Sequence, residues 1–144
     1  MPGKGAYIDT SVLGAYYCPE ALSGAAEAAL QDIEIPVVSI LTEVEFCSLV
    51  ARKRRLNELS EGQAKQVLDL FGTHVAEGFY RRLSIPTEHF LKARHLIASG
   101  IGSLRTLDAL HLAAASAESL LLMTADREFA RVARRHKNAV ILVH

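Results

Sequence analysis

Five short, mainly apolar segments recur along the chain, and segments of helical period follow each of the first four. The apolar segments are residues 6–9, 35–39, 80–85, 120–124 and 139–143. Strands that are apolar throughout and are separated by helices are typical of a parallel sheet buried on both faces. The sequence therefore predicts an α/β fold, a three-layer α/β/α sandwich. Its 144 residues fit one domain, 1–144.

Helices are expected between these strands, and several carry recognisable signals. They are residues 23–32, 41–55, 60–78, 87–100, 106–119 and 127–136. Ser60 and Gln63 have the spacing of a capping box, and Thr87 and Thr106 are candidate N-caps. In the second helix, one apolar stripe is expected to face the core. It consists of Leu41, Val44, Leu49 and Val50.

The composition restricts the class of protein. With 16 basic and 16 acidic residues the formal charge is zero, so binding of nucleic acid must depend on local charge. No apolar stretch is long enough to span a membrane, and no signal peptide precedes the first strand, which favours a cytoplasmic protein. Cys18 and Cys47 are far apart and lack a CxxC spacing, so we expect free, mostly buried thiols.

Acidic side chains lie just beyond two of the predicted strands. Asp9 follows the first strand and Asp126 the fourth, at the sheet edge where such folds bind ligands. Glu45 and Asp108 lie in the first turns of two helices and could face the same edge. Four neighbouring carboxylates repel one another, and a divalent cation removes that cost. Mg²⁺ or Mn²⁺ bound there could activate water for phosphodiester hydrolysis.

Each acid also has a purely structural interpretation. Asp9 and Asp126 could cap the helices that follow them, and Asp108 could complement a helix dipole. The second motif offers both Glu43 and Glu45. Two positions apart on a helix, these side chains point about 200° from each other, so only one can face the metal.

Four motifs together resemble the PIN domain family, and specifically the VapC-type toxins of toxin–antitoxin pairs. They are YIDTSVLG at 7–14, SILTEVEFCSLVARK at 39–53, RTLDALHLAAA at 105–115 and LLLMTADREFARVA at 120–133. The resemblance implies a five-stranded parallel sheet and a Mg²⁺- or Mn²⁺-dependent endoribonuclease that cuts an RNA substrate. It also implies a homodimer and an antitoxin partner that blocks the site.

The resemblance assigns roles to particular residues of this sequence. The catalytic and metal-binding acids would be Asp9, Glu45, Asp108 and Asp126. Hydroxyl groups that support the site would be those of Thr10, Ser11 and Thr124. Glu45 is favoured over Glu43, because the family pattern places its acid directly before the stretch that reads xxSLVAR.

One histidine and several basic residues lie near these motifs. His111 follows Asp108 by one helical turn, in an almost entirely apolar helix. A hydrogen-bonded histidine beside the site is therefore expected rather than a metal ligand. Arg105, Arg52 and Lys53 are candidates for contacts with RNA phosphates, although basic residues at helix ends also have ordinary structural roles.

Two other functions fit parts of the pattern. An aspartyl-phosphate phosphotransferase or receiver-like domain would use Asp9 as its nucleophile. That chemistry requires a second acid close to the first, and Ser11 occupies the expected position. A non-catalytic PIN-like interaction module would tolerate the loss of site acids, and all four are present.

Overall fold

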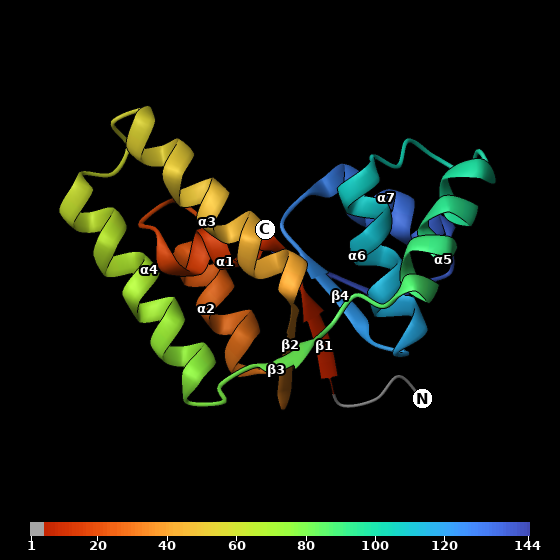
Figure 1. Ribbon diagram of the computed structural model, residues 1–144, viewed down its shortest axis with the longest axis horizontal. Coiled ribbons are helices and arrows are strands. Elements are labelled where there is room, and N and C mark those ends of the chain that lie inside the picture. Colours follow the sequence, from red (N-terminus) through yellow and green to blue (C-terminus); the bar gives the residue numbers. More distant parts are fainter. Residues whose placement is uncertain (1–4) are drawn as a thin grey trace.

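A computed structural model describes residues 5–144 and contains a five-stranded parallel sheet with helices on both faces (Figure 1). The strands are β1 (Gly5–Ile8), β2 (Ile35–Ser39), β3 (Arg81–Leu83), β4 (Leu121–Thr124) and β5 (Val140–Leu142). The helices are α1 (Thr10–Tyr17), α2 (Ser23–Gln31), α3 (Ile40–Arg55), α4 (Glu61–Ala76), α5 (Thr87–Ala98), α6 (Thr106–Ala117) and α7 (Arg127–Arg135). The predicted α/β/α sandwich is confirmed.

The order of the strands places a crevice at the centre of the sheet. The order is β3-β2-β1-β4-β5, and all neighbouring strands run parallel. From β1 the chain builds outward through β2 and β3, and it then returns to the other side of β1 with β4. The connections that follow β1 and β4 therefore leave in opposite directions, which opens a crevice beyond the carboxyl ends of these two strands.

Alternation along the strands supplies two separate cores. Ala6 and Ile8 of β1 pack toward the core formed with α1 to α4, whereas Tyr7 between them packs toward α6 and α7. Val38 and Val37 of β2 divide in the same way. Figure 1 shows the corresponding layers, with α1 to α4 on one side of the sheet and α5 to α7 on the other.

The rotation of α3 about its axis differs from the one predicted. Its fully buried positions are Thr42, Phe46 and Val50, which recur every four residues. Val44 is two positions from Phe46, on the opposite face, and 64% of it is exposed. The prediction that Val44 belongs to the core was therefore wrong. The Phe46 ring packs 4.7 Å, centroid to centroid, from that of Phe71 in α4, and this contact fixes the rotation of α3.

The predicted helix caps are confirmed in one case and wrong in two. The Ser60 hydroxyl accepts from the backbone N–H of Gln63, and the Gln63 side chain accepts from the N–H of Ser60. Thr87 and Thr106 instead occupy the first positions inside α5 and α6, where they cannot serve as N-caps. In both helices the residue before the threonine takes the N-cap position without a side-chain bond.

Two further predictions concern cysteines and the membrane. Both thiols are free, but only Cys18 is buried, and Cys47 is exposed. The exposure of Cys47 follows from the rotation of α3, since Phe46 takes the buried position beside it. Within residues 5–144, no helix has both the length and the apolar character needed to cross a bilayer.

Gly102 lies in the loop that leads into α6, and a side chain there would collide with α7. Its φ is +72°, and an added Cβ would lie 2.7 Å from Cγ1 of Val132. Val132 is β-branched and cannot easily turn away. We expect Gly102→Ala to lower the free energy of unfolding by about 2–4 kcal/mol, from left-handed backbone strain plus overpacking.

Gly100 provides a matched control for this prediction. It has the same φ of +72°, but an added Cβ would meet no atom within 4 Å. Gly100→Ala should therefore cost only the backbone strain, about 1–2 kcal/mol. Urea unfolding of both variants measures the difference. Equal losses would show that the contact with Val132 does not constrain the loop.

Candidate active site

The first candidate acid lies where the crevice begins. Ile8 at the end of β1 is paired with Met123 of β4, and the backbone N–H of Asp9 donates to the Met123 carbonyl at 2.9 Å. This continuation of the ladder places Asp9 beside Thr124, the last residue of β4. The Asp9 side chain thus projects from the switch point of the sheet, in the position expected from the sequence.

Two hydroxyl groups hold one oxygen of Asp9. Oδ2 accepts a hydrogen bond from Ser11 Oγ at 2.6 Å and another from Thr124 Oγ1 at 2.8 Å. Although Asp9 occupies the N-cap position of α1, its side chain makes no capping bond. The structural interpretation of Asp9 as a cap therefore does not describe its contacts. Among the described residues none donates to the other oxygen, Oδ1, which is free to bind a ligand.

Glu45 is held in a similar way. Thr10 Oγ1 donates to Glu45 Oε1 at 2.8 Å, and the same oxygen contacts Nε2 of His111. Burial alone would raise the pKa of Glu45, but the hydrogen bonds from His111 and Thr10 keep it below its ordinary value. The carboxylate is therefore ionised at neutral pH. No residue in the described range donates to its second oxygen.

Glu43 points to a different part of the surface. Both of its oxygens accept from the Arg82 guanidinium of β3, each at 2.9 Å. Of the two candidate acids in this motif, Glu45 is thus the one bonded to Thr10, the first residue of α1 and the neighbour of Asp9, whereas Glu43 is engaged in an ion pair. This arrangement favours Glu45 as the site acid.

Asp108 and Asp126 line a common hollow of about 360 Å³, together with Arg105. Asp126 caps α7, since its Oδ1 accepts from the backbone N–H of Phe129 at 3.0 Å. The capping interpretation of Asp126 is thus correct, but it occupies only one carboxylate oxygen. Arg105 Nε lies 3.7 Å from Asp108 Oδ2, with 84% of the arginine side chain exposed.

Charge interactions link Asp108 to Asp9 and Asp126. Burial raises the pKa of Asp108 above its ordinary value, and the negative charges of Asp9 and Asp126 raise it further. Arg105 partly opposes the increase. Mutual repulsion among these carboxylates is the effect that a bound cation would relieve.

The chemistry of these donors fits a hard divalent cation. Carboxylate oxygens are the ligands that Mg²⁺ and Mn²⁺ prefer, and three of the acids have one oxygen fixed and one open. Within residues 5–144, however, no three acidic, histidine or cysteine side chains already form a cluster that could hold an ion. Charge interactions couple Asp9 and Asp126 to Asp108, but these acids do not form a finished coordination sphere.

The family model of the PIN domain matches residues 6–135. The chain belongs to the PIN domain family. No curated protein matches it.

Several solved structures share the fold of this PIN domain over nearly its whole length. VapC20 from Mycobacterium tuberculosis, a toxin that cleaves the sarcin–ricin loop, has a TM-score of 0.69 and 16% identity, covering 88% of this chain and 93% of that one. A toxin–antitoxin complex from Klebsiella pneumoniae has a TM-score of 0.66 and 19% identity, covering 96% and 98%. VapBC2 from Rickettsia felis, bound to a DNA fragment from their promoter, has a TM-score of 0.69 and 14% identity, covering 97% and 99%.

The basic candidates lie at different distances from the acids of the PIN domain. Arg105 lines the hollow that contains Asp108 and Asp126. Arg52 and Lys53 lie about two helical turns beyond Glu45, at the far end of α3. Lys53 also has partners of its own, since its Nζ lies 3.8 Å from Glu20 and 3.6 Å from Glu58. Of these three candidates, Arg105 is therefore the one that lies beside the acids.

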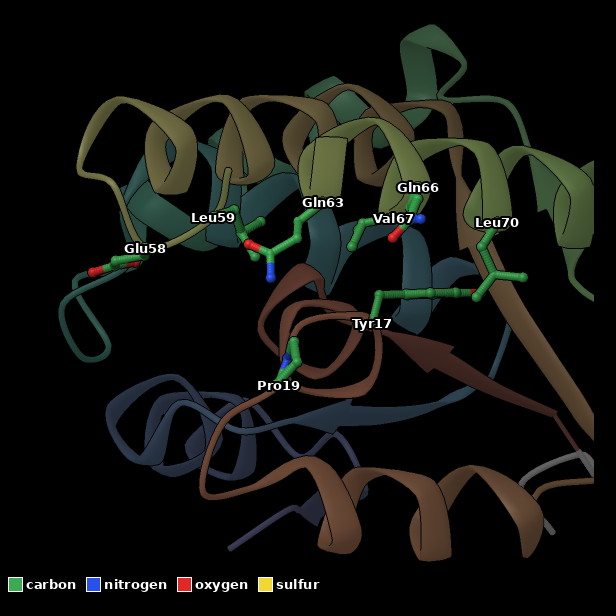
Figure 2. A pocket seen from close by; sticks show the side chains of 8 residues that line it. All are labelled: Tyr17, Pro19, Glu58, Leu59, Gln63, Gln66, Val67 and Leu70. Atoms are coloured by element: carbon green, nitrogen blue, oxygen red, sulfur yellow. The ribbon is translucent and has the colours of Figure 1, made fainter. Parts of the chain in front are cut away.

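Another hollow, of about 430 Å³, separates α4 from the end of α1 and contains none of the four acids (Figure 2). Tyr17, Val67 and Leu70 supply apolar walls, and Gln63 and Glu58 supply polar atoms. None of the described residues that line it is basic, so it is poorly suited to bind a phosphate group. The crevice beyond β1 and β4 remains the candidate active site.

Three buried polar residues next to His111 were not predicted from the sequence, namely Tyr7, Ser39 and Thr42. The phenol of Tyr7 lies 2.7 Å from Ser39 Oγ, 3.3 Å from Thr42 Oγ1 and 2.6 Å from His111 Nδ1. Burial, with smaller contributions from the charges of Asp9 and Glu45, raises the pKa of Tyr7 to about 12. The available signal was a tyrosine in the middle of an apolar strand, because a buried phenol usually requires a hydrogen-bond partner.

Proposed function

We propose that this PIN domain is a metal-dependent endoribonuclease that hydrolyses RNA phosphodiester bonds with water. The observation that carries the proposal is the arrangement of the acids. Asp9, Glu45 and Asp126 each have one oxygen fixed by hydrogen bonds, and Asp108 has a raised pKa caused by burial and by Asp9 and Asp126. The likeness to VapC20, a toxin that cleaves the sarcin–ricin loop, supports a cleavage reaction.

The residues have distinct proposed roles. Asp9, Glu45, Asp108 and Asp126 would hold Mg²⁺ or Mn²⁺, directly or through water. When bound, such an ion lowers the pKa of water to give a nucleophile and stabilises the leaving oxygen. Ser11, Thr124 and Thr10 restrict the acids to one orientation through their hydrogen bonds. Arg105, largely exposed beside Asp108, is placed to contact a substrate phosphate.

We also propose that the protein is the toxin of a type II toxin–antitoxin pair, restrained by an antitoxin that blocks these acids. The similar toxin–antitoxin complexes from Klebsiella pneumoniae and Rickettsia felis support this assignment. A homodimer is the proposed assembly. Exposed apolar side chains support it, because Val44 of α3 is 64% exposed and Phe90 of α5 is 53% exposed beside one apolar hollow.

A cleavage assay tests the proposed activity. The purified protein, incubated with a pool of structured RNAs and Mg²⁺ or Mn²⁺, is expected to cut RNA at sites that sequencing of the new ends would identify. A chelator should abolish cleavage, and excess metal should restore it. The Asp108→Asn variant, purified identically, controls for contaminating nucleases. Cleavage that persists with a chelator, or no cleavage of any RNA, would contradict the proposal, and the second result would favour a non-catalytic module.

A further inference from the structure

A buried polar chain runs from the sheet to the Glu45 carboxylate. Its members are Ser39, Tyr7, His111 and Glu45, and they come from β2, β1, α6 and α3 respectively. Ser39, Tyr7 and His111 are at most 1% exposed, whereas the Glu45 side chain is 21% exposed at the crevice. This series of hydrogen bonds therefore begins inside the core and ends at Glu45, one of the candidate site acids.

The chemistry of the hydrogen-bond partners identifies the group that donates to Glu45. Glu45 is ionised and can only accept, so Nε2 of His111 is the donor to Oε1. The phenol oxygen of Tyr7 lies 2.6 Å from Nδ1 of His111. Ser39 Oγ, at 2.7 Å, can donate to the phenol oxygen. We assign Nε2 of His111 as the donor to Glu45, with the Tyr7 phenol beside Nδ1 and Ser39 Oγ beside the phenol.

From this arrangement we infer that His111 and Tyr7 are positioning residues that hold Glu45 in the orientation required to bind the catalytic cation. The inference rests on the proposed metal-dependent function. A glutamate has three rotatable side-chain bonds, and the bonds from His111 and Thr10 both fix Oε1. Oε2 is then the oxygen that no described residue donates to. Neither His111 nor Tyr7 is assigned any contact with metal or RNA.

The main histidine variants are His111→Leu, which removes the donor, and His111→Gln, whose amide can still donate to Glu45. Partners that orient metal ligands typically contribute 10- to 100-fold to metal affinity or activity. We expect His111→Leu to raise the half-saturating Mn²⁺ concentration, measured by electron paramagnetic resonance without RNA, by about 10- to 100-fold. His111→Gln should recover most of that loss. Equal losses in the two variants would overturn the inference, because they would reflect packing alone.

A tyrosine pair offers a matched control and guards against misfolding of the histidine variants. Tyr7 and Tyr17 are both buried, and each phenol lies 2.6 Å from a histidine Nδ1 and 2.7 Å from another hydroxyl. The partners of Tyr17 are His74 and Tyr80, on the α4 side of the molecule. Tyr7→Phe should weaken Mn²⁺ binding several-fold, whereas Tyr17→Phe should leave it unchanged.

The outcomes separate this inference from the function on which it rests. If the wild-type protein neither binds Mn²⁺ nor cuts RNA, the proposed function fails. If the wild type does both, but Tyr7→Phe and Tyr17→Phe have the same Mn²⁺ half-saturation, only the positioning role fails. A selective loss in Tyr7→Phe and His111→Leu, with recovery in His111→Gln, supports it.

Discussion

The Asp9→Asn variant is expected to lose about a thousand-fold or more in the rate of RNA cleavage while keeping its fold. Metal-assisted charge stabilisation is worth several kcal/mol, and each 1.36 kcal/mol corresponds to a factor of ten in rate. The substitution removes the negative charge at the switch point of the sheet. The amide oxygen can still accept the hydrogen bonds that Ser11 and Thr124 donate to Asp9 Oδ2. The loss should therefore reflect metal binding rather than unfolding.

The measurement is single-turnover cleavage of one defined RNA at saturating Mn²⁺, with thermal unfolding followed in parallel. Asp32→Asn is a suitable control, because Asp32 is an exposed carboxylate at the end of α2. It changes the net charge equally without altering the crevice. Cleavage by Asp9→Asn within tenfold of the control would contradict the assignment of Asp9. Beryllofluoride binding at Asp9 in the wild type would instead favour an aspartyl-phosphate enzyme.

The layers of this fold could be predicted from the sequence because strands that are apolar throughout, separated by helices, fit few folds other than a parallel sheet covered on both faces. Apolar strands such as Leu121–Thr124 must be covered on both faces, and the helices between them supply that cover. The position of Asp9 followed from the same pattern, since a residue that ends a central strand must lie at the carboxyl edge of the sheet. The succession of apolar and helical segments along the sequence was sufficient for both predictions.

Details that depend on packing between distant segments could not be predicted in this way. The rotation of α3 is set by the contact between Phe46 and Phe71, which are 25 positions apart, and it decides that Val44 is exposed. Helix geometry alone also left Glu43 and Glu45 open, and only the family pattern favoured Glu45; their partners lie elsewhere in the chain. Arg82 of β3 engages Glu43, and His111 of α6 contacts Glu45. No local spacing encodes these partners.

The Asp108→Asn variant should be more stable than the wild type without metal and less stable than the wild type with Mn²⁺. In the metal-free protein the pKa of Asp108 is raised, first by burial and then by the charges of Asp9 and Asp126. A carboxyl group with a raised pKa binds its proton more tightly in the folded state than in the unfolded state. In its ionised form the group therefore weakens the fold, and asparagine removes that cost. The lost ion pair with Arg105, an exposed side chain, offsets little of the gain.

We expect Asp108→Asn to raise the Tm of the metal-free protein at pH 7 by about 2–4 °C, the change that roughly 1 kcal/mol produces in a domain of this size. The gain should shrink as the pH falls and Asp108 becomes protonated in both states. Mn²⁺ should reverse the ranking, because an ion at 100 times its Kd stabilises the wild type by about 2.7 kcal/mol and the variant much less. Thermal scans from pH 4 to 8, with and without Mn²⁺, measure both effects. A variant less stable than the wild type at pH 7 without metal would show that Asp108 is not under repulsion from Asp9 and Asp126.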